Sequence, residues 1–363
     1  MKVEGTRKGQ VPQEKRRIRT LVVDDSFFMR TLISDMLNSD PEIEVIDTAK
    51  DGDAALEKTK TLRPDVVTLD YLMPGTNGLS TIKNIMNTRP TPLVMLSAYT
   101  EKGALTTLKC LEAGAVGFVS KPSSEVSLDI EKVRDELIEE VKKASKMDIR
   151  KVKSILTRER VKLFMEPSTP VQERVIVIGA STGGPQVLEL ILSELPHNLP
   201  ASVLVVQHMP AEFTGPLAKR FDQMSEIVIK EAEDGDVIEP GRVYIAPGDF
   251  HLTVKREERE GEVKAVVRLN RGPLAHGLRP SIDVTMKSVS EIYGRNAVGI
   301  LLTGMGEDGV EGMRAIKGSE GKTIAQDEAT SVIFGMPKRA IEEGVVDKIL
   351  PVFEVSQEII RLL

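Results

Sequence analysis

The segment Arg174-Val-Ile-Val-Ile-Gly-Ala-Ser-Thr-Gly-Gly184 carries a strand pattern, a tight turn and a hydroxyl side chain in immediate succession. Its run of valine and isoleucine predicts a strand that is buried on both faces, as in a parallel sheet. The glycine-rich turn places Ser181 where this strand ends, and Pro185 then opens a helical pattern, since proline suits a first helical turn. Gly179 to Gly183 matches G-x-S-x-G, the pattern of a nucleophile elbow. On this segment alone, a phosphate-binding loop or a plain turn is the alternative.

A histidine follows the next strand, where it could serve the elbow as a general base. The apolar segment Ser202–Val206 predicts that strand, and His208 comes just after it. A right-handed crossover between successive parallel strands sets them side by side, so we expect His208 to lie beside Ser181. The other histidines, at positions 197, 251 and 276, lie in loops or at a strand start, and the sequence assigns them no role.

A carboxylate can complete a triad. An apolar strand predicted at Val298–Leu302 ends in a glycine-rich turn that contains Asp308. Asp308 can accept a hydrogen bond from the ring nitrogen of His208 that faces away from the serine, which would fix the tautomer and stabilise the imidazolium. Glu307 is a rival acid from sequence alone, and Asp283 is a weaker one because it lies inside the start of a helix.

The order of the three residues along the chain is serine, histidine, aspartate. Enzymes of the α/β-hydrolase fold run serine, acid, histidine, so the elbow does not make this an ordinary α/β-hydrolase. The turn lacks the G-x-x-x-x-G-K-[ST] pattern, which weakens the phosphate-loop alternative. Between the histidine and the acid, Arg242–Ala246 and His251–Val254 predict a hairpin, Glu257–Glu262 a solvated turn, and Ile282–Ile292 a helix.

The first half of the chain alternates apolar and amphipathic segments. The predicted strands are Thr20–Val23, Glu44–Asp47, Val66–Leu69, Leu93–Leu96 and Gly117–Val119. The predicted helices are Phe27–Leu37, Asp53–Leu62, Leu79–Met86 and Lys102–Ala113. Strands interleaved with helices predict a doubly wound parallel sheet, an α/β fold in which ligands bind at the carboxyl ends of the strands.

Charged and hydroxyl side chains stand at those strand ends. Asp24 and Asp25 follow the first strand, Asp70 the third, Ser97 the fourth and Lys121 the fifth. Carboxylates brought together repel each other unless a cation joins them, and a few oxygen ligands suit a Mg²⁺ ion that also meets a phosphoryl group. The lysine and the serine can donate to phosphoryl oxygens.

Composition narrows the function further. At 363 residues, the chain is long enough for two domains. Its net charge of −6 argues against a general nucleic-acid-binding protein, and no apolar run is long enough to span a membrane. A single cysteine, Cys110, excludes an internal disulfide framework and favours the reducing cytoplasm. Residues 1–19 are basic without an apolar core, so we expect a mobile, solvated arm and not a signal peptide.

The first half resembles a response-regulator receiver domain. The resemblance rests on Val22-Val-Asp-Asp-Ser26, Asp70-Tyr-Leu-Met-Pro74 with Asn77-Gly78, Ser97, and Lys121-Pro122. It implies that Asp70 accepts a phosphoryl group from a histidine kinase. It further implies that Mg²⁺ is held by Asp25, Asp70 and the carbonyl of Leu72, with Asp24 nearby. The switch residues it implies are Ser97 and Phe118, with Lys121 at the phosphoryl group.

The second half resembles the CheB family of chemotaxis protein-glutamate methylesterases. The matching segments are Gly179–Gly184, Gln207–Pro210, Tyr244–Gly248 and Leu302–Gly309. The resemblance implies a triad of Ser181, His208 and Asp308, and an oxyanion hole to which Met305 contributes. The backbone N–H of Thr182 is a second plausible oxyanion donor. Members hydrolyse glutamate methyl esters on chemoreceptors and deamidate receptor glutamines, two acyl transfers to water that one site can perform.

We therefore expect a receiver domain at residues 18–137, a linker at 138–172 with a flexible junction at Pro167–Pro170, and a Rossmann-like methylesterase domain at 173–363. Phosphorylation of the receiver is expected to activate the enzyme. The expected partners are a chemotaxis histidine kinase and methylated chemoreceptors, with no nucleic acid, and the esterase needs no cofactor. The competing hypothesis is a non-catalytic regulator that only binds a partner, because a fold alone never proves activity.

Overall fold

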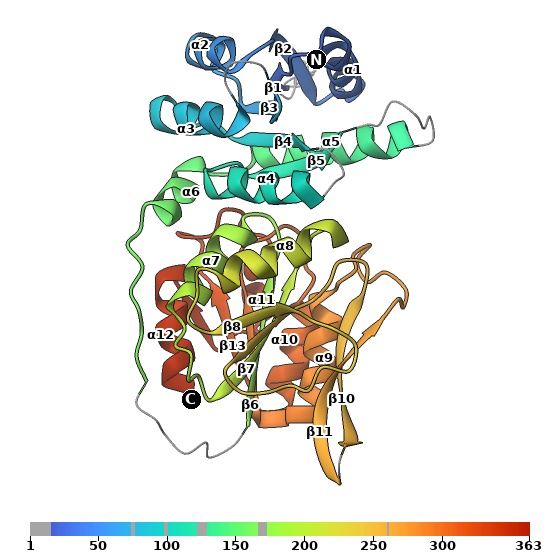
Figure 1. Ribbon diagram of the computed structural model, residues 1–363, viewed down its shortest axis with the longest axis vertical. Helices are drawn as coiled ribbons and strands as arrows, with labels where there is room; N and C mark the ends of the chain where they lie inside the picture. The colour runs from blue at the N-terminus through green and yellow to red at the C-terminus, as the bar shows by residue number, and fades with distance from the viewer. Residues whose placement is uncertain (1–15, 74–76, 98–100, 122–128, 166–172, 260) are drawn as a thin grey trace, which may run out of the picture.

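The computed structural model describes residues 16–73, 77–97, 101–121, 129–165, 173–259 and 261–363. These residues form two α/β units stacked along the long axis of the molecule (Figure 1). The predicted N-terminal arm, up to residue 15, and the predicted junction at Pro167–Pro170 lie outside the described residues. The predicted fold class, two parallel-sheet domains, is confirmed.

The first unit has a parallel sheet of order β2-β1-β3-β4-β5, the flavodoxin-like order. Its strands are β1 (Ile18–Val23), β2 (Ile43–Ala49), β3 (Val66–Asp70), β4 (Leu93–Ser97) and β5 (Gly117–Ser120). Its helices are α1 (Phe27–Asn38), α2 (Gly52–Leu62), α3 (Gly78–Thr88), α4 (Glu101–Glu112) and α5 (Asp129–Ser145). Every strand and helix predicted for this half is present. Ser26, Asp51 and Asn77 cap the first three helices through side-chain oxygens.

Helix α5 completes the first unit. It packs against β5 and α1, and the expected domain boundary at residue 137 falls inside it. The short helix α6 (Ile149–Leu156) then lies against α7 (Gly184–Glu194) of the second unit.

The second unit has a larger parallel sheet of order β14-β13-β12-β6-β7-β9-β8. Its strands are β6 (Arg174–Ala180), β7 (Ala201–Gln207), β8 (Val228–Glu231), β9 (Arg242–Ile245), β12 (Ala297–Leu301), β13 (Lys322–Gln326) and β14 (Lys348–Leu350). Its remaining helices are α8 (Ala211–Asp222), α9 (Ile282–Tyr293), α10 (Val310–Gly318), α11 (Met336–Glu342) and α12 (Val352–Leu362), with a 3₁₀ turn η1 at Gly294–Asn296.

Strand β6 lies between β12 and β7 and is buried on both faces, as its sequence predicts. Ile176 and Ile178 join the apolar cluster that continues into the first unit. Val175 and Val177 join the cluster on the opposite face. Burying a side chain of this size stabilises the fold by roughly 1.5–3 kcal/mol. The apolar run therefore fixes the strand whose end carries Ser181.

The predicted hairpin of Arg242–Ala246 with His251–Val254 is wrong. Strand β9 pairs in parallel with both β7 and β8, so its edges are already occupied. Strand β10 (His251–Arg259) instead pairs with β11 (Glu262–Asn270) in a separate antiparallel ribbon. Of the charged residues predicted as a solvated turn, Glu257 lies in this ribbon opposite Lys264 and accepts a hydrogen bond from Arg268.

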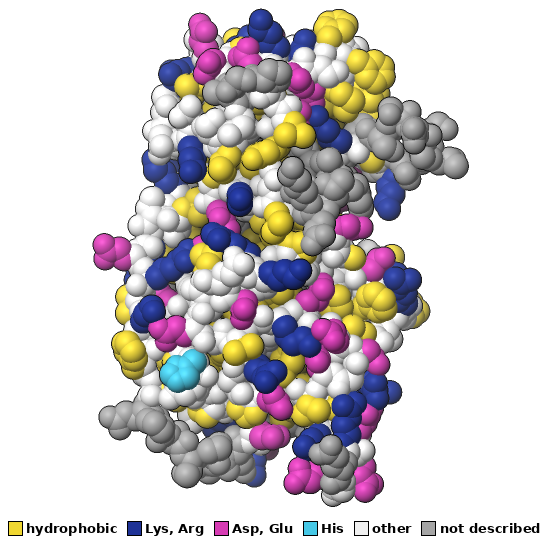
Figure 2. All heavy atoms as spheres, in the orientation of Figure 1, with side chains coloured by type: hydrophobic (Ala, Val, Ile, Leu, Met, Phe, Trp, Pro, Cys, Tyr) yellow, Lys and Arg dark blue, Asp and Glu magenta, His cyan; other side chains and the backbone are white. Residues whose placement is uncertain are grey.

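The surface shows mixed charge. On the face drawn in Figure 2, positive and negative side chains are interspersed over both units and do not gather in a patch of one sign. None of the helices in the described ranges is long and apolar enough to cross a bilayer.

Candidate active site

Ser181 stands at the predicted elbow. It follows the last residue of β6, and the chain turns through Gly183, at φ 77°, into α7. The backbone N–H of Ser181 donates to the carbonyl of Thr303, and Gln207 donates to the carbonyl of Ser181. Gly304 lies so close that a Cβ there would be 2.7 Å from the Ser181 Cβ. Neighbouring strand ends therefore hold the serine from both sides.

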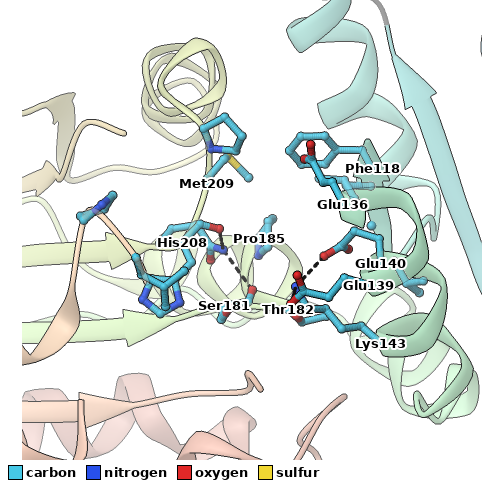
Figure 3. A pocket seen from close by; sticks show the side chains of 18 of the residues that line it. Phe118, Glu136, Glu139, Glu140, Lys143, Ser181, Thr182, Pro185, His208 and Met209 are labelled. Atoms are coloured by element: carbon cyan, nitrogen blue, oxygen red, sulfur yellow. Dashed lines mark hydrogen bonds and ion pairs between the residues drawn. The ribbon is translucent and has the colours of Figure 1, made fainter. Parts of the chain in front are cut away.

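His208 and Asp308 form a tight pair beside this turn. His208 Nε2 lies 2.8 Å from Asp308 Oδ2, and both side chains are buried. The backbone N–H of His208 donates to the carbonyl of Ala180, the residue before Ser181. Figure 3 shows His208 and Ser181 side by side at the same edge of the sheet. The three residues of the predicted triad are thus brought together at the carboxyl ends of β6, β7 and β12.

Asp308 is held as an anion by several donors. Burial raises its pKa, but hydrogen bonds from His208 and from the backbone of Ile282 and Asp283 outweigh this, so its pKa lies below the usual value. The Ser281 hydroxyl also donates to Asp308 Oδ1, at 2.8 Å. A carboxylate can only accept, so His208 must carry its proton on Nε2, which leaves Nδ1 as an acceptor.

The rival acids pair with other residues than His208. Glu307 has an exposed side chain, 3.8 Å from His276 Nδ1 and 3.8 Å from the Arg339 guanidinium. Asp283 is buried and pairs with His276 at 2.9 Å. Sequence alone could not separate the adjacent residues 307 and 308, because the direction of each side chain depends on the turn geometry. It also missed His276, since nothing in the local pattern distinguishes this loop histidine.

Two backbone N–H groups at the serine are available to a ligand. Within the described residues, the N–H of Thr182 and that of Met305 donate to no protein acceptor. Met305 is 41% exposed and follows Gly304, whose N–H bonds to Ile333. The family resemblance implies a role for Met305 in an oxyanion hole, and Thr182 is the second candidate donor.

A cavity of about 390 Å³ opens in front of the serine, and both units line it (Figure 3). The second unit supplies Ser181, Thr182 and His208. The first unit supplies Phe118 from β5 and one face of α5, which carries Glu136, Glu139, Glu140 and Lys143. The cavity in front of Ser181 is therefore bounded on its other side by the first unit.

The α5 face places carboxylates in this cavity. Figure 3 shows Glu140 and Lys143 extending from α5 toward Ser181 and Thr182, and Glu136 beside Phe118. Burial raises the pKa of Glu140, and burial together with the charge of Glu140 raises the pKa of Glu136. Lys143 Nζ lies 2.8 Å from both Glu139 and Glu140 and offsets part of this cost. When Glu136 and Glu140 are ionised, keeping the α5 face in this cavity therefore costs free energy.

Direct contacts close the interface around the cavity. Buried Gln186, in the first turn of α7, donates from Nε2 to the carbonyls of Leu111 and Ala115 in the first unit. Arg220 of α8 binds Glu112 of α4 through two hydrogen bonds, of 2.5 and 3.0 Å.

An aromatic contact joins the same two units. The Phe118 ring packs on Phe213 of α8 with centroids 4.2 Å apart. Sequence patterns gave no signal for any of these contacts across the interface, because they report local periodicity and not the packing of one unit on another.

A second charged cluster stands at the carboxyl edge of the first sheet. Asp24, Asp25 and Asp70 each offer a carboxylate oxygen within 4.8 Å of the others. Lys121 Nζ lies 2.8 Å from both Asp24 and Asp70. Burial raises the pKa of Asp70, although Lys121 opposes the rise. Leu72 is exposed beside this cluster, whereas the side chain of Ser97 lies outside the described part of the structure.

Comparisons with known proteins agree with both halves. The CheB methylesterase family model matches residues 176–359, and the response regulator receiver domain model matches residues 20–131. A protein-glutamate methylesterase/protein-glutamine glutaminase of Pyrococcus abyssi is 47% identical over 97% of this chain and 95% of its own. One from Thermotoga maritima is 43% identical over 96% and 99%.

A solved structure gives the same result. The Thermotoga maritima CheB methylesterase catalytic domain matches with a TM-score of 0.51 and 46% identity, covering 53% of this chain and all of that one. With the elbow serine, the histidine–aspartate pair and the receiver-type cluster in place, the chain belongs to the family of CheB methylesterases that carry a response-regulator receiver domain.

Proposed function

We propose that the chain is a protein-glutamate methylesterase and protein-glutamine glutaminase that phosphorylation of its receiver domain activates. The observation that carries the catalytic part is Ser181 at its elbow, beside the His208–Asp308 pair and open to one cavity. Family membership and the printed names of the relatives support the activity. The substrates are methyl-esterified glutamates and specific glutamines of chemoreceptors.

The geometry supports a covalent mechanism. His208 Nδ1 accepts the Ser181 proton as Oγ attacks the ester carbonyl carbon, and Asp308 stabilises the resulting imidazolium. The oxyanion of the tetrahedral intermediate accepts hydrogen bonds from the N–H groups of Thr182 and Met305. His208 then protonates the leaving methanol, or ammonia when the substrate is an amide.

Water completes the cycle. His208 takes a proton from water, which attacks the acyl-enzyme, and the breakdown of the second intermediate returns the proton to Ser181 and releases glutamate. Both substrates share the acyl-enzyme, so one site serves both reactions. Side chains and water account for every step, and we therefore keep the prediction that the esterase needs no cofactor.

Asp70 is the proposed phosphoryl acceptor, with a chemotaxis histidine kinase as phosphodonor. The cluster fits a divalent cation, because oxygen ligands from three carboxylates converge there. Asp25, Asp70 and the carbonyl of Leu72 would hold Mg²⁺, with Asp24 nearby. When bound, the ion would neutralise negative charge on the phosphoryl group. Lys121, already paired with Asp70, is placed to bind a phosphoryl oxygen.

The interface supports control of the esterase by the receiver. The residues that line the cavity from the first unit include Phe118 and the α5 face, so a receptor segment that approaches Ser181 would meet them. Phosphorylating Asp70 replaces one negative charge with roughly two, and Ser97 and Lys121 would turn toward the new group. Repacking around Phe118 would then disturb its contact with Phe213 and loosen the α4–β5–α5 face.

We retain the three-part division of the chain as part of the proposal, with one change. The packing of α5 on β5 favours a receiver that extends to residue 145 instead of 137. The catalytic domain begins near residue 173. We also propose that the protein works in the cytoplasm, because it must reach the proposed kinase and receptor segments there.

A small serine-directed phosphonate tests the catalytic part. It should label the wild type and not Ser181→Ala, with circular dichroism showing that both are folded. Equal labelling of both proteins would contradict the assignment, and absence of labelling in the wild type would favour the non-catalytic regulator.

A truncated protein tests the control. A chain starting near Glu173 should demethylate receptors faster than the unphosphorylated full chain, and a phosphodonor should accelerate only the full chain. The isolated homologous domain of known structure indicates that such a fragment folds. Equal rates for the two proteins would remove the gating role and leave the triad untouched.

A further inference from the structure

A second histidine–carboxylate pair lies directly behind the catalytic pair and has no role in the mechanism above. His276 Nε2 is 2.9 Å from Asp283 Oδ2. Asp283 is 3% exposed, and the His276 side chain is 35% exposed, so only the histidine meets solvent. The His276 nitrogen and the carboxylate oxygens of Asp283 and Asp308 all lie within 4.8 Å of one another.

Asp283 and Asp308 each accept hydrogen bonds from the backbone next to the other residue. Asp308, just before α10, accepts from the backbone N–H groups of Ile282 and Asp283 at the start of α9. Asp283, in the first turn of α9, accepts from the N–H groups of Gly309 and Gly312 at the start of α10. Gly309 is the residue after Asp308. The position of the proposed triad acid therefore depends on Asp283.

The loop that carries His276 is shaped to reach Asp283. Ala275 and Leu278 exchange two backbone hydrogen bonds, and the two residues between them have φ of 52° and 74°, as in a type I′ turn. A histidine at positive φ is unfavourable, and such strain persists where the surroundings hold it. The hydrogen bond to Asp283 helps to hold this side chain.

Charged groups surround both the His276–Asp283 pair and the His208–Asp308 pair. His276 faces Asp283, Asp308 and Glu307, and Arg339 from α11 approaches the far oxygen of Glu307. On the cavity side, the charged groups near His208 are Asp249, Arg279 and the α5 face of Glu136, Glu139, Glu140 and Lys143. Each buried aspartate thus has one histidine beside it, and only one of these histidines is proposed to react.

We propose that His276 and Asp283 are positioning residues that fix Asp308 and set the pH range in which His208 acts as a base. The inference rests on the proposed Ser181–His208–Asp308 triad. The negative charge of Asp283 adds to that of Asp308 and favours the imidazolium of His208. A proton on His276 offsets that charge, so the exposed histidine transmits solvent pH to the buried pair.

Replacing His276 or Asp283 should shift the acid limb of the pH profile for labelling of Ser181. The two replacements should shift it in opposite directions. In His276→Asn, the charge of Asp283 is no longer offset, His208 becomes more basic, and the limb moves up by about one pH unit. In Asp283→Asn, the added negative charge is lost and the limb moves down by a similar amount. Asparagine tolerates positive φ, so the turn at residue 276 is preserved in the first variant.

The test measures the rate at which a small alkyl fluorophosphonate labels Ser181 in the full chain, from about pH 5 to 9. The matched control is His197→Asn, an exposed histidine in the loop before β7, at the opposite edge of the sheet. It should leave the profile unchanged. A purely structural role would lower the rate of both test variants without moving the limbs apart.

Opposite shifts support the inference. Unshifted limbs in both variants, or shifts in the same direction, overturn it while leaving the triad intact. If Asp283→Asn fails to fold, the upward shift in His276→Asn decides the question alone. If the wild type shows no labelling that depends on Ser181, the proposed function and the inference fail together.

Discussion

Replacing Gln186 with glutamate should open the contact between the two domains and activate the unphosphorylated enzyme. Gln186 is 5% exposed, and its Nε2 donates to the carbonyls of Leu111 at 3.1 Å and Ala115 at 3.0 Å. Glutamate has the same shape but no donor when ionised, so its oxygen would face two carbonyl oxygens across the interface.

The size of the effect follows from these contacts. Two neutral hydrogen bonds contribute about 1 kcal/mol each, and leaving buried carbonyls and a carboxylate unpartnered adds a comparable penalty. A total of about 3 kcal/mol would change the ratio of closed to open forms roughly a hundredfold. The rise in activity stops when most molecules are open.

Methanol release from methylated receptor membranes measures the effect without a phosphodonor. The full-length Gln186→Glu protein should approach the rate of the isolated catalytic domain. Gln223→Glu, which adds the same charge at an exposed position after α8, should behave as the wild type. The interface argument fails if full-length Gln186→Glu keeps the wild-type rate. It fails equally if the substitution accelerates the isolated domain, because that effect would arise in the active site.

Three further predictions concern the other parts of the molecule. His208→Ala should reduce ester turnover by about four to six orders of magnitude, and Asp308→Asn by less than loss of Ser181, which steady-state rates on folded proteins will check. Calorimetry with beryllofluoride and Mg²⁺ should detect binding to the wild type but not to Asp70→Ala; equal binding would remove Asp70 as acceptor. Because the pKa of Glu140 is raised in the closed form, closure is strongest below about pH 4.5 and weakens as pH rises through the raised value. Small-angle scattering should show this opening in the wild type and a flatter pH response in Glu140→Gln.

Much of the fold could be predicted because the signals were local. The apolar run before Ser181 is buried on both faces, and such a run has few other stable placements than the middle of a parallel sheet. The strand ends then brought Ser181, His208 and Asp308 to one edge, since parallel strands all point the same way. The aspartates of the receiver cluster were found by the same reasoning.

What could not be predicted depends on contacts between distant parts of the chain. The apolar, β-branched residues of β9 suit a hairpin as well as a central strand, and only the neighbours β7 and β8 decide between them. Gln186 and Glu140 have no distinguishing local pattern, because their roles arise when one domain packs on the other. The pairing of His276 with Asp283 likewise requires the positive-φ turn, which the sequence did not indicate.

The central claim is that one serine performs both ester and amide hydrolysis on receptors. Its most direct measurement is methanol release and ammonia release from the same receptor membranes, with wild-type protein and folded Ser181→Ala. The account predicts that both products appear with the wild type, that a phosphodonor raises both rates by the same factor, and that both vanish in the variant. Loss of only one product in Ser181→Ala, or retention of both, would contradict it.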